Sequence, residues 1–226
     1  MVAKKNAAER AVELIKDGMT VGLGSGSTAS YAIANIGERV KRGLKIKAVA
    51  SSLKSETLAK SLMIPVFDPS QIDSIDIAID GADEVDTTGN LIKGGGGSLL
   101  REKIIAFGSK AFHVIVDDSK LVERLGNRAP VPVEITPFAA GLTMRHLQQL
   151  GCDPVMRRSN GKKFITDNGN LIADCSFEEI SEPAWLDVKI KMIPGVVETG
   201  LFSSKIVTSI FVASPTGEVR EILING

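Results

Sequence analysis

The sequence predicts an α/β protein in which a mostly parallel, Rossmann-like sheet flanked by helices is joined to a second, smaller α+β domain of split β-α-β, ferredoxin-like type. In the first half of the chain, short apolar segments of strand length alternate with segments of helical periodicity, which is typical of a parallel sheet. This alternation is broken by Gly126, Pro130 and Pro132. The second half then follows the order strand, helix, strand, hairpin, helix and strand, as in a split β-α-β unit.

The elements of the first half follow from the spacing of apolar residues. Ala8, Ala11, Val12 and Ile15 fall at helical spacing, so we expect a helix over residues 4–17. The other expected elements are strands at 20–23, 46–50, 64–67, 75–79 and 112–116, and helices at 29–40, at 54–62 and after the glycine run at 94–97. The segment 75–79 is mostly apolar, as in a strand that is buried within a parallel sheet.

The second half is predicted to form its own sheet. Its expected elements are strands at 131–135, 153–158 and 196–199, a helix at 137–150, a helix led by Pro183, and a hairpin of 164–166 with 171–175. We take Trp185, Val188 and Met192 as the core-facing stripe of the later helix. A closing hairpin at 205–213 and 219–223 should return to the first domain. The expected domain limits are 1–126 for the α/β domain, 127–199 for the α+β domain and 200–226 for the returning C-terminal segment.

Composition excludes several classes of protein. Lysine plus arginine and aspartate plus glutamate number 27 each, so no net charge attracts the chain to nucleic acid or to an anionic membrane. There is no apolar signal core at the N-terminus, and no segment approaches the ~20 apolar residues of a membrane span, so we expect a cytoplasmic protein. Cys152 and Cys175 lack zinc-ligand spacing and are interpreted as inert thiols.

A glycine-rich turn follows the strand at 20–23. A dinucleotide-binding turn needs glycine at its first, third and sixth places, but the sixth residue counted from Gly22 is Ser27, and no Walker A lysine follows. The turn instead offers backbone N–H groups and the hydroxyls of Ser25, Ser27 and Thr28 at a helix N-terminus, which predicts a cradle for one phosphate. The alternative is an ordinary tight turn with a serine or threonine cap.

A second candidate site follows the strand at 75–79. Asp80 is expected at the carboxyl end of that strand, where open α/β sheets bind their ligands. The glycine run at 94–97 lets a ligand approach the backbone closely, and Ser98 can cap the next helix. The alternative for residues 80–86 is a solvated acidic loop.

Glu102 is the candidate base on that next helix. Leu99 precedes it by three residues, and Ile105 and Ala106 follow it by three and four, so its neighbours on the helix face are apolar. Such a setting would make the carboxylate a better base. The alternative is a glutamate on the helix surface.

Two further residues lie within or just after the strand at 112–116. Lys120 would lie at the carboxyl end of this strand, although in isolation it reads as a solvated loop lysine. His113 lies within the apolar strand and is interpreted as a packed core histidine rather than a ligand.

Several motifs together identify a family resemblance. Gly24-Ser-Gly-Ser-Thr-Ala, Asp80-Gly-Ala-Asp-Glu, Lys93-Gly-Gly-Gly and Arg101-Glu-Lys-Ile-Ile closely resemble the type A ribose-5-phosphate isomerases. In the second half, Pro132-Val-Glu-Ile, Thr166-Asp-Asn-Gly-Asn and Ile193-Pro-Gly-Val-Val fall in the order expected for that family. The fourth glycine, Gly97, followed by Ser98, departs from the usual end of the glycine run.

The resemblance implies an aldose-ketose isomerase that interconverts D-ribose 5-phosphate and D-ribulose 5-phosphate in the pentose phosphate pathway of carbohydrate metabolism. It implies no metal and no organic cofactor, and a homodimer or homotetramer. Glu102 matches the general base, and Asp80, Asp83 and Lys93 match the other catalytic positions. The matching substrate-contacting positions are Ser25, Gly26, Ser27, Thr28, Asp80, Gly81, Ala82, Asp83, Lys93, Gly94, Gly95, Gly96 and Lys120.

The residue types fit this chemistry. Moving a carbonyl between C1 and C2 requires a carboxylate that takes a proton from one carbon and returns it to the other through an enediol. Lys93 and the amides of the glycine run could steady the oxygen that becomes negative. Asp80 and Asp83 would hold sugar hydroxyls and help to open the furanose ring.

Two other classes of protein stay open at this point. A ligand-sensing protein could bind a sugar phosphate in the same cradle without converting it. An amino-sugar phosphate deaminase or a coenzyme A transferase could use a similar scaffold. The deaminase needs an additional acid/base group that we do not find, and the transferase needs a glutamate that forms an acyl intermediate.

Overall fold

The computed structural model describes residues 2–225, which form two compact units. The first unit contains the residues up to Ala82, Arg101–Lys120 and those from Ser204 onward, and the second contains Asp83–Leu100 and Leu121–Ser203. Residues 83–100 thus group with the second unit, although we expected them within the domain 1–126. The domain limits themselves stay a prediction, because compact units need not fold independently.

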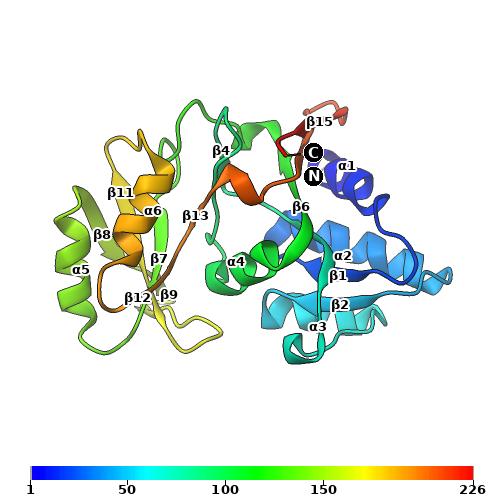
Figure 1. Cartoon of the computed structure of the whole chain (residues 1–226), viewed down its shortest axis with the longest axis horizontal. Helices are drawn as coiled ribbons and strands as arrows, with labels where there is room; N and C mark the ends of the chain where they lie inside the picture. Colours follow the sequence, from blue (N-terminus) through cyan, green and yellow to red (C-terminus); the bar gives the residue numbers. More distant parts are fainter. Residues whose placement is uncertain (1, 226) are drawn as a thin grey trace. The chain divides into compact units, whose positions relative to one another are not determined.

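The first unit is built on a six-stranded sheet with the order β2-β1-β3-β6-β14-β15 (Figure 1). Its strands are β1 (Thr20–Leu23), β2 (Lys47–Ala50), β3 (Ile75–Asp80), β6 (Ser109–Asp117), β14 (Ser209–Ala213) and β15 (Val219–Leu223). All neighbouring pairs are parallel except β14 with β15. The mostly parallel sheet is therefore confirmed. Its parallel strands have a doubly wound order: β2 lies on one side of β1, and β3, β6 and β14 follow on the other side. Ligands of such sheets bind where the strand order reverses, which is here between β1 and β3.

Four helices accompany this sheet among the described residues. They are α1 (Val2–Val12), α2 (Gly26–Lys41), α3 (Leu53–Ser61) and α4 (Leu99–Phe107), the last of which belongs to the first unit from Arg101 onward. Two short 3₁₀ turns, η1 (Pro69–Gln71) and η2 (Asp118–Lys120), precede β3 and follow β6, and a third, η3 (Ser204–Ile206), precedes β14.

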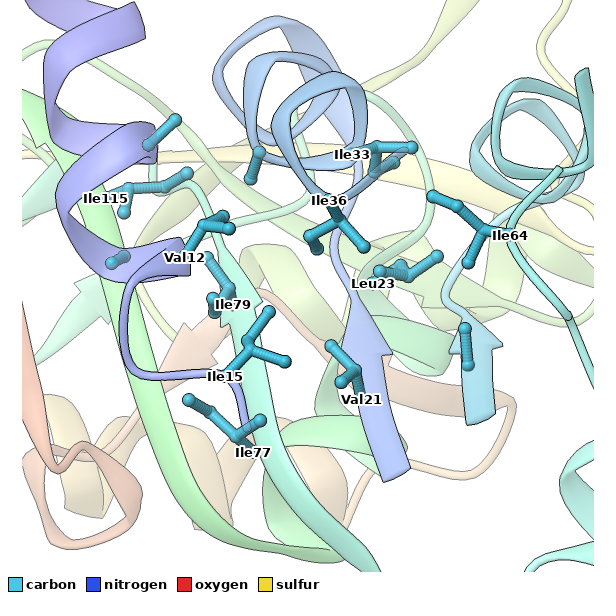
Figure 2. Close-up of a cluster of buried hydrophobic side chains, with 14 of the residues drawn as sticks. Val12, Ile15, Val21, Leu23, Ile33, Ile36, Ile64, Ile77, Ile79 and Ile115 are labelled. Atoms are coloured by element: carbon cyan, nitrogen blue, oxygen red, sulfur yellow. The ribbon is translucent and has the colours of Figure 1, made fainter. Parts of the chain in front are cut away.

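A core of aliphatic side chains packs α1 and α2 against one face of this sheet (Figure 2). Alternate residues of a strand share a face, so β1 contributes Val21 and Leu23 while β3 contributes Ile77 and Ile79. Ile33 and Ile36 of α2 are among their partners in this core. Burial of each large aliphatic side chain stabilises the fold by about 1.5–3 kcal/mol. The intervening residues of β1 and β3 consequently face the opposite side of the sheet.

Two elements are shorter than expected. The first helix ends at Val12 rather than at residue 17, although Ile15 is still buried in the core. The strand expected at 64–67 is only an isolated bridge between Val66 and Ala48. Met63 has a left-handed φ of 61° and Pro65 has no N–H to donate, so the backbone here cannot extend a regular ladder.

His113 is a packed core residue, as interpreted from the sequence. It is 7% exposed, its Nδ1 lies 2.9 Å from Ser209 Oγ, and its ring centroid lies 6.0 Å from that of Phe211. Burial lowers the pKa of His113 below its ordinary value of 6.5, with an opposing effect from the Glu221 carboxylate.

This environment predicts a pH dependence of stability. The unfolded chain binds a proton at His113 below pH 6.5 more readily than the folded chain does, so the free energy of unfolding should fall as the pH is lowered through that value. His113→Gln removes the titrating group. The difference in thermal midpoint between the parent and this variant should therefore shrink from pH 7.5 to about pH 5.5. A difference that stays constant over this range would show that His113 does not contribute.

The second unit contains a four-stranded antiparallel sheet with the order β12-β7-β11-β8. Its strands and helices are β7 (Val131–Ile135), α5 (Ala140–Gln148), β8 (Cys152–Met156), β11 (Leu171–Phe177), α6 (Pro183–Lys191) and β12 (Val196–Thr199). This is the predicted split β-α-β unit. A smaller sheet joins β4 (Glu84–Val85), β5 (Leu91–Ile92) and β13 (Leu201–Phe202), and β9 (Arg158–Ser159) pairs with β10 (Lys162–Lys163).

The stripe predicted for the helix after Pro183 is wrong. Trp185, Val188 and Met192 are 55%, 56% and 73% exposed, whereas Leu186 and Ile190 are buried in the core of the second unit. Both sets have helical spacing, so periodicity does not distinguish them.

The hairpin expected at 164–166 and 171–175 is also wrong in its first strand. Residues 164–166 form no strand, and Thr166 closes a turn by donating its N–H to Asn170 O. Buried Glu134 holds this turn, because its Oε1 accepts hydrogen bonds from Thr166, Asn168 and Asn170.

Across residues 2–225, no helix combines the length and the apolar character needed to cross a membrane.

Candidate active site

Asp80 is the last residue of β3 and its carboxylate closes the turn that follows β1. Asp80 Oδ1 accepts hydrogen bonds from the N–H of Ser25 at 2.9 Å and from the N–H of Gly81 at 2.7 Å. Only 4% of Asp80 is exposed. A Cβ atom on Gly24 would lie 2.1 Å from Asp80 Oδ1, so glycine is required for the carboxylate to occupy this position. The two candidate segments of the sequence therefore meet at the point between β1 and β3.

Ser25 precedes α2 but its hydroxyl does not cap that helix. Ser25 Oγ lies 2.6 Å from Ser51 Oγ, and Ser55 Oγ donates to Gly24 O at 2.7 Å. These hydrogen bonds among Ser25, Ser51, Ser55 and Gly24 O hold the turn in place. The first N–H groups of α2 are consequently left for another acceptor, which is the arrangement used for anions at helix N-termini. The contact of Ser51 with Ser25 was not predicted from the sequence, since nothing in the spacing of the two residues links them.

Lys4 adds a positive charge to this turn. Lys4 Nζ donates to Ser27 Oγ at 3.2 Å, in the first turn of α2. Gly81 lies beside the same turn, because a Cβ atom on Gly81 would lie 3.7 Å from Thr28 Cβ. Lys4 was also missed, since the sequence alone gives only a solvated lysine near the N-terminus. The phosphate cradle expected at 25–28 thus has a cation, a helix N-terminus and hydroxyl groups in one place.

The helix α4 packs on the face of the sheet opposite the aliphatic core. A Cβ atom on Gly22 would lie 2.5 Å from Ile105 Cγ2 and 3.0 Å from Ala78 Cβ. Ile105 therefore rests on β1 and β3 where these strands carry small residues. Since Asp80 follows Ala78 by two residues, Asp80 faces the same side as α4.

The direction of α4 determines where Glu102 lies. β6 begins at Ser109, directly after the helix, and Ser109 pairs with Ile75 at the start of β3. The helix therefore runs toward the amino ends of the strands, and its first turns lie toward their carboxyl ends. Glu102 is one turn before Ile105 and is 6% exposed. Glu102 and Asp80 thus lie on one face and toward one end of the sheet.

The remaining candidates of the first unit lie at the same end of its strands. Gly81 and Ala82 directly follow β3 and are half-buried. Lys120 is the last residue of the 3₁₀ turn that follows β6 and is also half-buried.

Asp83, Lys93 and the glycine run at 94–96 form a set within the second unit. Gly95 N–H donates to Asp83 Oδ2 at 2.7 Å, which ties the glycine run to the acidic segment. Lys93 is 2% exposed, and its Nζ lies 5.4 Å from the ring centroid of Phe202. No atom lies within 4 Å of the position a Cβ would take on Gly96, so the backbone is accessible there.

The backbone at the start of the glycine run is closely packed. Gly94 has a left-handed φ of 100°, and a Cβ on it would lie 2.8 Å from Leu99 Cβ. A Cβ on Gly200 would lie 2.3 Å from Lys93 O. Lys93 and Gly94 therefore have little freedom to shift. Within residues 2–225, no three His, Cys, Asp or Glu side chains gather into a group that could hold a metal ion.

Comparisons with known proteins show which family the chain belongs to. The family model described as Ribose 5-phosphate isomerase A (phosphoriboisomerase A) matches residues 47–217. A ribose-5-phosphate isomerase A from Thermomicrobium roseum is 48% identical over 217 residues, which cover 95% of this chain and 91% of the relative.

Solved structures show the same likeness. The ribose 5-phosphate isomerase A of Methanocaldococcus jannaschii has a TM-score of 0.92 and 41% identity, with 97% of each chain covered. A D-ribose-5-phosphate isomerase solved in complex with phospho-erythronic acid has a TM-score of 0.93 and 40% identity, again with 97% of each chain covered. With the family model and a close relative both spanning most of its length, the chain belongs to the ribose 5-phosphate isomerase A family and is an isomerase.

Proposed function

We propose that the chain interconverts D-ribose 5-phosphate and D-ribulose 5-phosphate through an enediol, with Glu102 as the general base. The observation that carries this proposal is the position of Glu102, a buried carboxylate on α4 on the same face and toward the same end of the sheet as Asp80. Membership of the family supports the substrate. The solved relative that binds phospho-erythronic acid supports a phosphorylated ligand.

The chemistry assigns a role to each candidate group. Glu102 takes the proton from C2 of the open-chain aldose, and the electron pair of that C–H bond forms the C1=C2 double bond while O1 gains the negative charge. The enediol then collapses: the proton returns from Glu102 to C1, and O2 becomes the carbonyl oxygen as its own proton passes to O1. Lys93 and the amides of the glycine run steady the negative oxygen. These roles rest on residue chemistry and on the family resemblance.

The phosphate and the hydroxyl groups are assigned to the other candidates. Ser25–Thr28 at the N-terminus of α2 would bind the phosphate, with Lys4 as an additional cation. Asp80 and Asp83 would bind hydroxyls and assist ring opening, and Lys120 would contact the substrate. Because the phosphate is remote from C1 and C2, its binding energy serves to position the reacting carbons.

One assay separates this proposal from the alternatives. Purified protein is incubated with ribose 5-phosphate in excess EDTA, and formation of the ketose is followed. We expect turnover that is unaffected by the chelator, because carboxylate and lysine groups can perform the chemistry. Binding without turnover would indicate a sensor, and turnover restored only by added Mg²⁺ or Zn²⁺ would contradict the mechanism. The pentose phosphate pathway, the cytoplasmic location and the homodimer or homotetramer stay predictions.

Thr28→Ala should weaken binding of the phosphorylated substrate. We expect KM for ribose 5-phosphate to rise more than kcat falls, because the contact is made in both the ground state and the transition state. Thr57→Ala is the matched control, since Thr57 lies on α3 and bonds only within its own helix. The measurement compares ribose 5-phosphate with unphosphorylated ribose. A Thr28→Ala variant that prefers the phosphorylated sugar as strongly as the parent would remove this turn from the phosphate site.

A further inference from the structure

Arg157, which follows β8, connects a carboxylate to the glycine run. Its Nη1 donates to Gly94 O at 2.8 Å and to Gly95 O at 3.1 Å. Its Nε donates to Asp174 Oδ2 at 2.9 Å, and its Nη2 donates to Asp174 Oδ1. The two side chains are 13% and 22% exposed, so this is a mostly buried ion pair. All four residues belong to the second unit.

These contacts fix the direction of two backbone N–H groups. In a trans peptide the carbonyl and the N–H of one unit point in opposite directions. The peptide that carries Gly94 O also carries the N–H of Gly95, which donates to Asp83 Oδ2 at 2.7 Å on the side away from Arg157. The peptide that carries Gly95 O likewise directs the N–H of Gly96 away from Arg157. Gly96 is exposed, and no atom beyond its two chain neighbours lies within 4 Å of a Cβ built on it.

A glycine run needs such an anchor. Glycine has no side chain whose packing could select one orientation of a peptide, so hydrogen bonds must do so. Gly97 N–H donates to Gly94 O at 3.0 Å, and Arg157 binds both Gly94 O and Gly95 O. The aromatic ring of Phe164 restricts the end of the run, since a Cβ on Gly97 would lie 2.5 Å from it, but it makes no hydrogen bond to the peptides at Gly94 and Gly95. A cation on the carbonyl oxygen also polarises the peptide and makes its N–H a stronger donor.

We propose that Arg157, held by Asp174, is a positioning residue for the isomerase reaction. It serves the reaction by orienting and polarising the amide of Gly96, while its bond to Gly94 O orients the Gly95 amide that binds Asp83. The inference rests on the proposed function, in which amides of the glycine run steady the negative oxygen of the enediol, and Gly96 N–H is the one that Arg157 directs away from itself. Arginine suits the task because its planar fork of N–H groups reaches a carboxylate and two carbonyls at once. The single nitrogen of a lysine cannot make all four contacts.

The experiment compares Arg157→Lys and Arg157→Ala with the control Arg158→Ala. Arg158 is the neighbouring, exposed arginine, and its Nη1 bonds only to Gly161 O in the β9–β10 hairpin. We expect kcat for ribose 5-phosphate to fall by about 10-fold or more in both Arg157 variants, toward the ~10²–10³ that loss of an oxyanion donor costs. KM should change by less than about threefold, because the Gly96 amide acts mainly in the transition state. Arg158→Ala should match the parent.

Rescue by a small cation separates positioning from folding. Guanidinium chloride at low, non-denaturing concentration should restore part of kcat in Arg157→Ala, while sodium chloride at the same concentration should not. Asp174→Asn keeps the arginine but weakens its anchor, so its kcat should lie between those of the parent and Arg157→Ala. Thermal midpoints are measured for every variant.

The outcomes are distinct. If the parent does not isomerise ribose 5-phosphate, the proposed function fails before Arg157 is tested. If the parent is active and Arg157→Ala keeps kcat within about twofold, the positioning role is wrong. If every variant loses activity only in proportion to its unfolded fraction, and guanidinium restores nothing, the ion pair is structural and the proposal is overturned.

Discussion

Glu102→Gln should lower kcat for ribose 5-phosphate by about 10²-fold or more, the range typical of a lost general base. Glutamine keeps the shape of the side chain in its buried position but cannot accept the proton from C2. Substrate binding should largely persist, since the phosphate cradle and the hydroxyl-binding groups are unchanged. The measurement is steady-state kinetics together with a binding titration of the variant.

Glu38→Gln is the matched control for this change. Glu38 lies on α2, and its carboxylate is paired with Lys41 on the exposed surface. The same chemical substitution there should leave kcat unchanged. Near-parental turnover by Glu102→Gln, with the variant folded and binding substrate, would exclude Glu102 as the base and direct attention to Asp80 or Asp83.

Gly24→Ala should reduce kcat/KM by about 10²-fold, because a displacement near 1 Å of a catalytic group has an effect of this size. The added methyl group would lie 2.1 Å from Asp80 Oδ1 and 2.3 Å from Asp80 Cγ. Either the carboxylate or the turn after β1 must move, which separates Asp80 from the N–H of Ser25. Overpacking of this kind should also destabilise the fold by about 1–3 kcal/mol.

Gly141→Ala provides the comparison for a glycine without close neighbours. No atom lies within 4 Å of its Cβ position, and it is within α5. Alanine there should leave activity unchanged and raise the thermal midpoint slightly, since it favours a helix over glycine by about 1 kcal/mol. If Gly24→Ala were as active as Gly141→Ala, the close contact with Asp80 would have no role in catalysis.

The sheet of the first unit was predictable because the apolar side chains of its strands are buried together when the strands are parallel and helices cover them. Val21 and Leu23 share a face with Ile77 and Ile79, and helices with apolar stripes follow in the order that parallel strands require. The point between β1 and β3 then follows from strand order. Asp80 and the turn at 24–28 were found by their place at strand ends, and the structure joins them through the hydrogen bond from Ser25 N–H.

Contacts between segments distant in sequence were not predictable. Lys4 and Ser27, Ser25 and Ser51, and the pair of Arg157 with Asp174 depend on tertiary packing, and no local spacing connects them. The prediction of which face of α6 is buried failed for a different reason. Both of its faces carry apolar residues, so the sequence could not show that Leu186 and Ile190, rather than Trp185, face the core. The catalytic roles of the candidate residues are still predictions.

The central claim is that Glu102 moves a carbon-bound proton through an enediol, and isotope exchange tests it most directly. The parent and Glu102→Gln are each incubated with ribose 5-phosphate in D₂O, and the sugars are analysed by NMR. The account predicts that the parent places deuterium at C1 of ribulose 5-phosphate and at C2 of ribose 5-phosphate, while Glu102→Gln places almost none at either carbon. Ketose formed by the parent without deuterium at these carbons, or parental exchange by folded, substrate-bound Glu102→Gln, would contradict it.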